Sequence, residues 1–344
     1  MKRKKISMQD IAERCGTTVP TVSYVLSGSE NRRVRADLRE RILSCAAELG
    51  YQQLERKKAP GLIALVLPQL DNIFFRRMVL SIEKTASAAG YYTVVYHTDD
   101  TPEREQLFLQ VLAAEKIKGI FLVPAVNSLV TPEQLKSMRI PFVIAERPLQ
   151  FDGEYDLFAM DNFDAGYQAT RALTRAGHRS IGLITWETSA LTLLNRPLGY
   201  VKALEEAGIL YRPEYVVSGP FDEQSGYQLA NRLLDQHPEL DALVLAYHVQ
   251  ALGCVRALRE RGVAIPDRLS VVIIGNPTWA DMTTPAFTHV TLSSTEIGTQ
   301  ATQALIRKIE KRTGPDKQWV TIKGTLVEGG SVRALPALHS QLLP

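Results

Sequence analysis

The feature that most restricts the fold of this chain is an alternation of short apolar runs with amphipathic helical patterns after residue 60. Strands that alternate with helices form parallel sheets covered by helices on both faces, and eight strands suit two doubly wound lobes. The sequence therefore predicts an α/β fold with two lobes. The eight apolar runs lie at residues 62–68, 92–98, 119–124, 141–146, 180–185, 215–219, 241–246 and 269–275. The main helical patterns lie at 74–89, 102–115, 164–176, 250–261 and 296–312, with further strands expected within 287–293 and 319–327.

The first 60 residues differ from the rest in charge. They contain 13 Lys and Arg against 7 Asp and Glu, a net charge of +6, whereas the other 284 residues contain 27 against 30, a net charge of −3. Positive charge concentrated in one segment favours a polyanionic partner such as nucleic acid. A solvated basic tail is the alternative interpretation.

Three short helices are predicted in this basic segment. Ser7 can cap the first helix, and Gly16 can end it in the left-handed conformation. Thr18 can cap a second helix, which tolerates Pro20 in its first turn, and a third helix is expected at 36–48. Two helices joined by a tight turn and followed by a third predict a helix-turn-helix unit, whose second helix fits the major groove of DNA. The apolar stripes of the second and third helices are expected to bury Val22, Val25, Leu26, Leu38, Ile42, Leu43 and Ala46.

The stretches "DIAERCGTTVPTVSYVLSG" (10–28) and "LRERILSCAAELGY" (38–51) resemble the DNA-binding signature of the lactose/galactose repressor family. The resemblance covers almost the whole chain, including "DNFDAGYQATRALTRAGHRSIGLI" (161–184) and "LVEGGSVR" (326–333). It implies a helix-turn-helix head followed by a periplasmic-binding-protein-like pair of doubly wound parallel-sheet lobes with a cleft between them. The implied function is a sequence-specific transcriptional regulator, a repressor of carbohydrate or related catabolic genes, which a small-molecule effector controls from the cleft.

These patterns divide the chain into three parts. A DNA-binding domain with a short linker is expected at 1–60, an effector-binding and dimerisation domain at 61–335, and a tail at 336–344. Lobe one is expected at about 61–160 and 291–317, and lobe two at about 161–290 and 318–335.

The resemblance also implies a set of DNA contacts. The hydroxyl groups in and near the second helix can donate to phosphates, whereas Val19, Pro20 and Tyr24 occupy positions that contact base edges in the family. Arginine is frequent in the family at the position of Tyr24, and tyrosine cannot make its bidentate contact to guanine, so a different operator is expected. The expected DNA-contacting residues are Ser7, Thr17, Thr18, Val19, Pro20, Thr21, Ser23, Tyr24, Ser27, Arg32, Arg33, Tyr51, Leu54 and Lys57. Two heads related by a dimer axis require a palindromic operator in double-stranded DNA.

The linker departs from the family pattern. Family members place a hinge helix with a leucine wedge for the minor groove before the first lobe, after a "PNxxAR"-like stretch. Here "GYQQLERKKAPGLIAL" (50–65) is roughly five residues shorter and lacks that stretch. Leu54 is the one apolar candidate for a wedge, while Lys57 and Lys58 can neutralise phosphates. The short linker favours the absence of a normal hinge helix.

Loops at the carboxyl ends of the predicted strands supply a candidate effector site. The expected residues are Asp71, Phe74, Phe75, Glu146, Arg147, Asp161, Thr192, Arg196, Phe221, His248 and Asn276. Two carboxylate positions of the family hold His248 and Gly275 instead, which leaves Arg147 and Arg196 with less compensating charge. The expected effector is therefore a small anion such as a phosphorylated sugar or sugar acid. A cleft that binds no small molecule is the alternative.

Other classes of function are less well supported. No GxGxxG, GxSxG, HExxH or P-loop motif occurs in the sequence, so an α/β metabolic enzyme with a nucleotide cofactor is not expected, and no cofactor or metal is assigned. Control by a partner protein rather than a metabolite is the main alternative. The three cysteines are too scattered for disulfides or a metal cluster, and the two that fall inside helical patterns are expected as buried free thiols. No signal peptide or membrane span is indicated, which predicts a cytoplasmic homodimer.

Overall fold

The computed structural model describes residues 6–26, 34–49, 51, 61–188, 191–312, 314 and 317–335, and for residues 191–193 it describes the backbone alone. It separates into two compact units, 1–60 and 61–344. The predicted contacts Ser27, Arg32, Arg33, Leu54 and Lys57, the linker and the 336–344 tail lie outside the described residues.

The first unit is a three-helix head. Its helices are α1 (Met8–Cys15), α2 (Val19–Leu26) and α3 (Ala36–Glu48). The predicted caps of α1 are confirmed, because Ser7 forms a capping box with Asp10 and Gly16 ends the helix at a φ of 63°. The head core forms around Ile11, Val22 and Ile42, which are fully buried, so the predicted stripes meet in one cluster.

Leu43 was expected in this core, and that prediction is wrong. Its side chain is 49% exposed, while Cys45, two positions further along α3, is buried together with Cys15. The helical stripe that faces α1 and α2 runs through Ile42, Cys45 and Ala46, which places Leu43 on the outer side of α3. All three cysteines are buried free thiols, which confirms the prediction made for two of them and extends it to the third.

The first lobe of the second unit contains a six-stranded sheet in which every strand pair is parallel. Its strands, in spatial order, are β11 (Trp319–Ile322), β5 (Leu157–Met160), β4 (Phe142–Ala145), β3 (Ile117–Leu122), β1 (Gly61–Leu67) and β2 (Tyr91–His97). The helices of this lobe are α4 (Ile73–Ala88), α5 (Pro102–Ala114), α6 (Pro132–Ser137) and α11 (Ser294–Ile309). The short strand β5 was not predicted.

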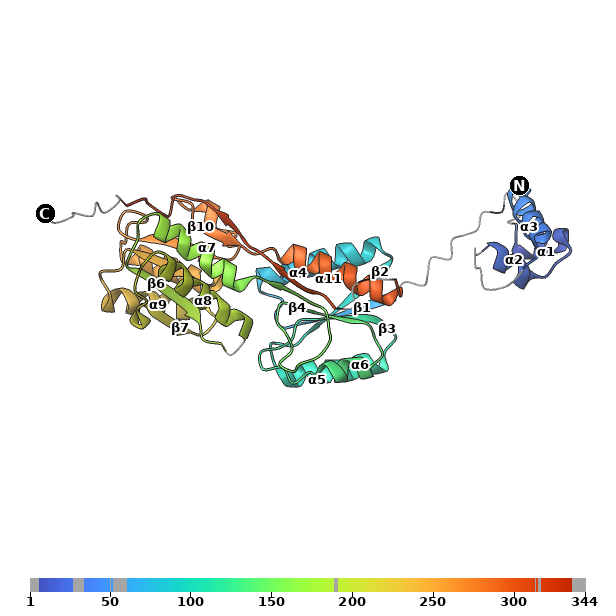
Figure 1. The fold of residues 1–344 in the computed structure, drawn as a ribbon, viewed down its shortest axis with the longest axis horizontal. Helices are drawn as coiled ribbons and strands as arrows, with labels where there is room; N and C mark the ends of the chain where they lie inside the picture. Colours follow the sequence, from blue (N-terminus) through green and yellow to red (C-terminus); the bar gives the residue numbers. More distant parts are fainter. Residues whose placement is uncertain are drawn as a thin grey trace. The chain divides into compact units, whose positions relative to one another are not determined.

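The second lobe repeats this plan (Figure 1). Its strands, in spatial order, are β12 (Thr325–Val327), β10 (Thr288–Thr291), β9 (Ser270–Ile274), β8 (Ala242–Leu245), β6 (Ile181–Trp186) and β7 (Val216–Gly219). The helices are α7 (Asn162–Arg175), α8 (Leu191–Glu206), α9 (Glu223–Gln236) and α10 (His248–Glu260), with 3-10 turns η1 (Pro213–Tyr215) and η2 (Ala280–Met282). Only the pairing of β10 with β12 is antiparallel in the described part of this sheet.

The chain passes between the lobes three times, from β5 to α7, from β10 to α11 and from β11 to β12. The last passage corrects the expected lobe boundary at 317/318. The predicted final strand is two strands, of which β11 pairs with β5 in the first sheet and β12 pairs with β10 in the second. The passage therefore lies at Lys323 and Gly324, and the first lobe includes residues up to 322.

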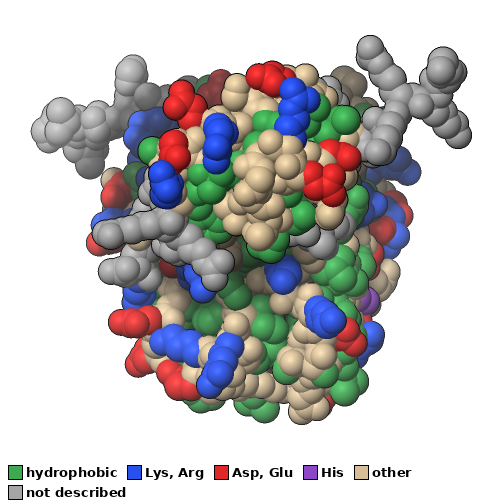
Figure 2. Space-filling view, turned by 90° about the vertical axis from the view of Figure 1, so that its right-hand side faces the viewer, with side chains coloured by type: hydrophobic (Ala, Val, Ile, Leu, Met, Phe, Trp, Pro, Cys, Tyr) green, Lys and Arg blue, Asp and Glu red, His purple; other side chains and the backbone are tan. Residues whose placement is uncertain are grey.

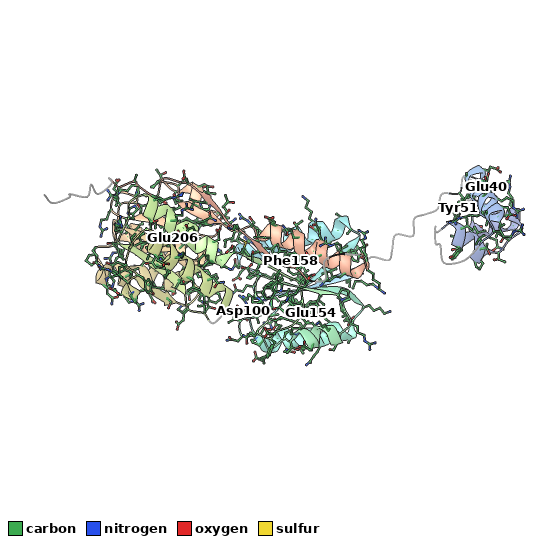
Figure 3. The ribbon with its side chains drawn as sticks, viewed as in Figure 1. Glu40, Tyr51, Asp100, Glu154, Phe158 and Glu206 are labelled. Atoms are coloured by element: carbon green, nitrogen blue, oxygen red, sulfur yellow. The ribbon has the colours of Figure 1, made fainter. Side chains whose placement is uncertain are left out.

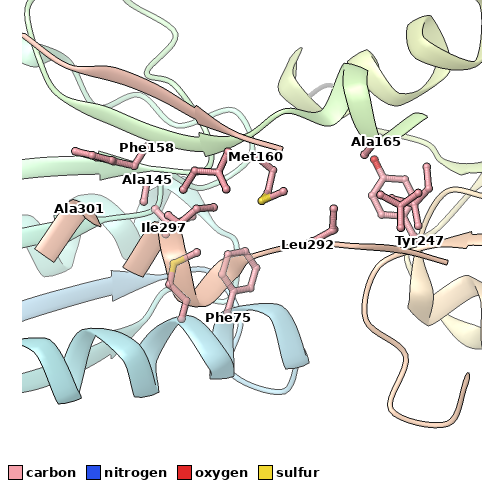
Figure 4. Close-up of a cluster of buried hydrophobic side chains, with 14 of the residues drawn as sticks. Phe75, Ala145, Phe158, Met160, Ala165, Tyr247, Leu292, Ile297 and Ala301 are labelled. Atoms are coloured by element: carbon pink, nitrogen blue, oxygen red, sulfur yellow. The ribbon is translucent and has the colours of Figure 1, made fainter. Parts of the chain in front are cut away.

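Helices cover both faces of each sheet because both faces of the strands are apolar. In the second lobe, Val244 packs in the cluster that contains α7 and α8, whereas Leu243 packs in the cluster that contains α9 and α10. One buried cluster also continues from lobe to lobe through Met160, Leu292 and Tyr247 (Figure 4). The two lobes therefore share an apolar contact close to the passages of the chain.

Glycines bring two helix pairs of the second lobe into backbone contact. A Cβ on Gly166 of α7 would lie 2.1 Å from the Arg196 carbonyl oxygen of α8, and one on Gly199 would lie 2.1 Å from that of Phe163. In the other pair, a Cβ on Gly253 of α10 would lie 1.8 Å from the Glu223 carbonyl oxygen of α9. No larger residue fits at these positions without moving the helices apart.

The surface carries charges of both signs. On the face drawn in Figure 2, Lys and Arg side chains lie among Asp and Glu side chains, with apolar side chains between them. The described residues drawn there therefore do not form a patch of one sign.

Candidate functional site

A cavity lies between the two lobes at the carboxyl ends of the strands. Seven of the eleven predicted effector contacts line it, namely Phe74, Phe75, Glu146, Arg147, Arg196, Phe221 and His248. Five further residues complete the lining, namely Gln69, Asn72, Trp186, Tyr247 and Leu292. Both lobes contribute side chains, so a ligand in this cavity contacts both.

Aromatic rings form much of the cavity wall. Trp186, Phe221 and Tyr247 follow or end three neighbouring strands of the second lobe and pack against one another, with ring centroids 4.9, 5.9 and 5.6 Å apart. Phe74 and Phe75, at the start of α4, face the cavity from the first lobe and form an edge-on pair at 5.4 Å. Such walls suit a ligand with a flat or ring-shaped apolar face.

Arg196 is held rigidly at the side of the cavity. Its Nε donates to Asn162 Oδ1 at 2.8 Å, and its Nη1 donates to the Ala246 carbonyl oxygen at 2.5 Å. The guanidinium carbon lies 4.3 Å from the centroid of the Tyr247 ring, within the range of a cation–π contact. The residue is only 5% exposed, so its orientation is fixed before any ligand binds. The close approach of α7 and α8 at Gly166 brings Arg196 beside Asn162.

The charge balance differs from the one predicted. Arg147 pairs with Asp100 at 2.5 Å, so this arginine has a counter-ion that the sequence did not reveal. Glu146 is also buried in the cavity wall, with a left-handed φ of 64°, and its Oε2 accepts from the Met160 amide at 3.3 Å. Burial raises the pKa of Glu146, and the hydrogen bond from Met160 and the charge of Arg196 offset part of that rise. The interpretation of two uncompensated arginines is therefore wrong for Arg147, whereas Arg196 has no carboxylate at ion-pair distance among the described residues.

His248 does not add positive charge to the site. Burial, together with the nearby charges of Arg196 and Arg77, lowers the pKa of its imidazole from 6.5 to about 4. The side chain is therefore neutral at pH 7 and can offer one donor and one acceptor to a ligand.

The lowered pKa of His248 predicts a pH-dependent stability. The unfolded chain binds a proton at His248 below about pH 6.5, and the folded protein does so only near pH 4, so folding free energy is lost as the pH falls through this window. Between pH 7 and pH 5 we expect the free energy of unfolding of the wild type to fall by about 2 kcal/mol more than that of His248→Gln. Urea unfolding at both pH values measures the difference. The raised pKa of Glu146 acts in the opposite direction in both proteins and so cancels. Equal pH dependence in the two proteins would contradict the prediction.

Four predicted effector residues lie outside the cavity lining. Asp71 is exposed, and Asp161 caps α7 by accepting from the Asp164 amide at 2.9 Å. Asn276 accepts from the Leu292 amide at 2.5 Å, and so fixes the loop after β9 to the passage between β10 and α11. The side chain of Thr192 lies outside the described part of the chain.

The lining residues that were not predicted also lie mainly at the carboxyl ends of strands, as the predicted ones do. Trp186 is the last residue of β6, and Tyr247 lies between β8 and α10, so both occupy carboxyl ends of strands. Asn72 caps α4 by accepting from the Phe74 amide at 2.9 Å. Leu292 directly follows β10 at the start of the passage to α11, so it also lies at the carboxyl end of a strand.

The head presents a candidate DNA interface on α2. Pro20 and Thr18 are exposed, while Thr17, Thr21, Ser23 and Tyr24 are partly exposed. The hydroxyls of Thr18 and Thr21 lie 2.9 Å apart at the amino end of the helix, where backbone amides and the helix dipole favour phosphate. Three predicted contacts also have internal roles: Val19 and Tyr51 are partly exposed and pack on the head core (Figure 3 labels Tyr51), and the exposed Ser7 binds Asp10.

The positive charge of the head lies mainly outside the described residues. The described part of 1–60 contains four Lys and Arg and five Asp and Glu, a net charge of −1. The remaining positions hold nine against two, a net charge of +7. The sequence predicted a basic domain, and the excess positive charge of that domain lies in residues 1–5, 27–33 and 52–60 of the sequence rather than in the described helices.

Comparison with known protein families agrees with this architecture. The family model for bacterial regulatory proteins of the lacI family matches residues 7–53. The model for periplasmic binding proteins and the sugar-binding domain of the LacI family matches residues 61–325. The chain belongs to the LacI family. The predicted family and fold are confirmed, and this LacI-family chain is a DNA-binding transcriptional regulator with a sugar-binding-type domain.

Similar proteins are also regulators. The HTH-type transcriptional repressor PurR of Haemophilus influenzae (strain PittEE) is 27% identical over 337 residues, which cover 96% of this chain and 99% of PurR. The regulator DegA of Bacillus subtilis (strain 168) is 28% identical over 306 residues, which cover 86% and 89% of the two chains. A solved complex of the regulator CelR with cellobiose matches at a TM-score of 0.70 and 26% identity, covering 95% of this chain and 99% of CelR. Among the helices that the structure describes, none has the length and apolar character required to cross a membrane.

Proposed function

We propose that this LacI-family chain is a homodimeric repressor that binds a palindromic operator and changes its operator affinity when a small neutral ring compound binds between the lobes. The observation that carries the proposal is the cavity lined from both lobes by aromatic rings and Arg196. A ligand that contacts both lobes binds most tightly at one relative position of the lobes. This difference in affinity is what effector action requires.

The chemistry of the cavity supports a neutral effector rather than the anion expected from the sequence. Arg147 is paired with Asp100, His248 is neutral, and Glu146 contributes a buried carboxyl group beside Arg196. A phosphate group would find Arg147 already paired and would have to share Arg196 with the Glu146 carboxyl group. Aromatic faces with a few fixed donors and acceptors suit a sugar ring and its hydroxyl groups. The similar regulator CelR was solved with cellobiose, which is a neutral sugar.

Exposed apolar side chains support self-association. The edge strand β2 exposes Tyr92 and Val95, and the adjacent helix α4 exposes Leu80. In the second lobe Leu210 and Met282 are more than 80% exposed. An exposed strand edge and large exposed apolar side chains are typical of an interface, here with a second copy of the chain. A dimer places two heads on two half-sites and so requires an inverted repeat. Because the operator is chromosomal DNA, the proposed place of action is the cytoplasm.

The proposal assigns the DNA contacts to α2 and to the basic segments that flank the head. Val19, Pro20 and Tyr24 contact base edges, and the hydroxyl groups of α2 contact phosphates. Lys57 and the arginines at 32 and 33 supply salt-dependent affinity.

The test combines DNA selection with a ligand panel. Genomic fragments bound by the full-length protein are sequenced, and an inverted repeat is expected among them. Neutral sugars, nucleosides and phosphorylated sugars are then compared for thermal stabilisation of the protein and for a change in affinity for that repeat. Binding that depends on salt but not on sequence would contradict the operator proposal. Operator control by phosphorylated sugars alone, or by a partner protein captured without any ligand, would contradict the effector proposal.

A further inference from the structure

Arg147 lines the effector cavity, but its guanidinium group is already occupied. Nη1 donates to Asp100 Oδ1 at 2.5 Å and Nη2 donates to Asp100 Oδ2 at 3.2 Å, so the pair is bidentate. Nη1 also donates to the Pro124 carbonyl oxygen at 3.0 Å. The side chains of Arg147 and Asp100 are only 7% and 15% exposed, so water screens the pair weakly.

Asp100 is held in place by its own loop, which connects β2 to α5. Its backbone amide donates to the Pro68 carbonyl oxygen at 3.1 Å, and its Oδ1 accepts from the Val126 amide at 2.9 Å. Its φ is 55°, a left-handed conformation that aspartate and asparagine adopt more readily than most residues. Asp100 is absent from the cavity lining and lies on the first lobe, where Figure 3 labels it.

A second carboxylate near Arg147 does not replace Asp100. Glu105 of α5 is completely buried, and its oxygens accept from the Ala125 amide at 2.8 Å and from the Ser128 hydroxyl at 2.5 Å. Burial raises the pKa of Glu105, which favours its neutral form. Asp100 is therefore the main counter-ion of Arg147 among the described residues.

We propose that Asp100 sets the charge selectivity of the effector site, because it neutralises Arg147 and so lowers the affinity of the cavity for anionic ligands. The inference rests on the proposed effector function and adds a specificity-determining residue that does not touch the ligand. As an ion pair, Arg147 and Asp100 have no net charge. Without Asp100, a second buried guanidinium group borders the cavity in addition to that of Arg196, and it attracts an anion through charge-assisted hydrogen bonds.

Asp100→Asn is the direct test, because it removes the charge and keeps the shape, an acceptor oxygen and tolerance of a positive φ. The probe is inorganic phosphate, titrated calorimetrically into the full-length protein. We expect its affinity for Asp100→Asn to exceed that for the wild type by at least about tenfold.

Asp99→Asn is the matched control. Asp99 precedes Asp100, has a φ of 56° and makes one long ion pair of 3.7 Å with Arg104, with a carboxylate that is 67% exposed. The Asp99→Asn substitution makes the same chemical change outside the cavity, so the phosphate affinity of this variant is expected to equal that of the wild type. A folded Asp100→Asn protein that binds phosphate no better than Asp99→Asn would overturn the inference.

The double variant Asp100→Asn with Arg147→Gln gives a second test, which does not depend on the stability of the single variant. It replaces a buried ion pair by two neutral amides, a change that is usually tolerated better than loss of one partner. Its phosphate affinity should return to the wild-type level, since both proteins then carry no net charge at this position. A double variant that binds phosphate tenfold more weakly than the wild type would show that Arg147 was never neutralised, and would overturn the inference. If no neutral sugar binds the wild type, the proposed effector fails, but the phosphate comparison still reports the charge of the cavity.

Discussion

Replacing Arg196 by methionine is expected to weaken effector binding by about 100-fold, while operator affinity without effector changes by less than about twofold. The guanidinium group is buried and fixed by Asn162, the Ala246 carbonyl oxygen and the Tyr247 ring, so it can bind a ligand without losing further conformational entropy. Methionine has a similar length and fills the space but donates no hydrogen bond. The head is a separate compact unit, so its helices keep their structure in the variant. Calorimetric titration of the effector and gel-shift titration of the operator measure the two affinities.

Two further variants make this experiment decisive. Arg256→Met is the matched control, because the guanidinium carbon of Arg256 also lies over a tyrosine ring, 4.6 Å from the ring centroid of Tyr227. The Arg256 side chain is 40% exposed, however, and lies outside the cavity lining. This variant should bind the effector as the wild type does. Arg196→Lys keeps the charge but cannot form the fork of donors, so it should lose most of the affinity. Full effector binding by a folded Arg196→Met protein would remove Arg196 from the site.

Gly253→Ala is expected to lower the free energy of unfolding by about 2–3 kcal/mol. Alanine is the better helix former by about 1 kcal/mol, so at an open helical position this change would stabilise the protein. Here the added Cβ would lie 1.8 Å from the Glu223 carbonyl oxygen, and α9 and α10 must separate to admit it. That separation also displaces the start of α10, which carries His248. Urea unfolding gives the free energy, and effector titration reports the displacement at the site.

The control for this substitution is Gly208→Ala, at a turn with a φ of 63° and no atom within 4 Å of the added Cβ. This control should lose only the free energy of unfolding that an alanine costs at a positive φ, about 1 kcal/mol. A Gly253→Ala protein as stable as the wild type would mean that the two helices tolerate a larger spacing.

The sequence predicted the fold well because the periodic signals were strong. The alternation of apolar runs and helices after residue 60 gave the parallel sheets, and Ser7 and Gly16 marked the ends of α1. The strand β5 was missed because Leu157–Met160 contains no β-branched residue, unlike the equally short strands β4 and β8. The two final strands were merged because the two residues between them carry no sign that the chain changes sheet.

The effector site was predicted less well, for an electrostatic reason. Strand ends located most of the lining, but the counter-ion of Arg147 lies 47 residues away in the sequence, in another loop. Sequence spacing therefore gave no indication of the Asp100 pair. The depressed pKa of His248 is a property of its burial, which a single sequence does not reveal either. The number of charges near the cavity was predictable, but their pairing was not.

The three passages between the lobes have a consequence for the order in which the chain can fold during synthesis. The second lobe is almost continuous in the sequence, from α7 to β10, and lacks only its edge strand β12. The first lobe begins earlier but receives its last covering helix later, because α11 covers β3, β4 and β5 and packs on α4. Until residue 309 has left the ribosome, the apolar face around Phe121 and Val143 has no complete cover. The lobe that is translated first thus waits longer for its last covering helix, and until then its sheet exposes apolar surface to aggregation and to chaperones.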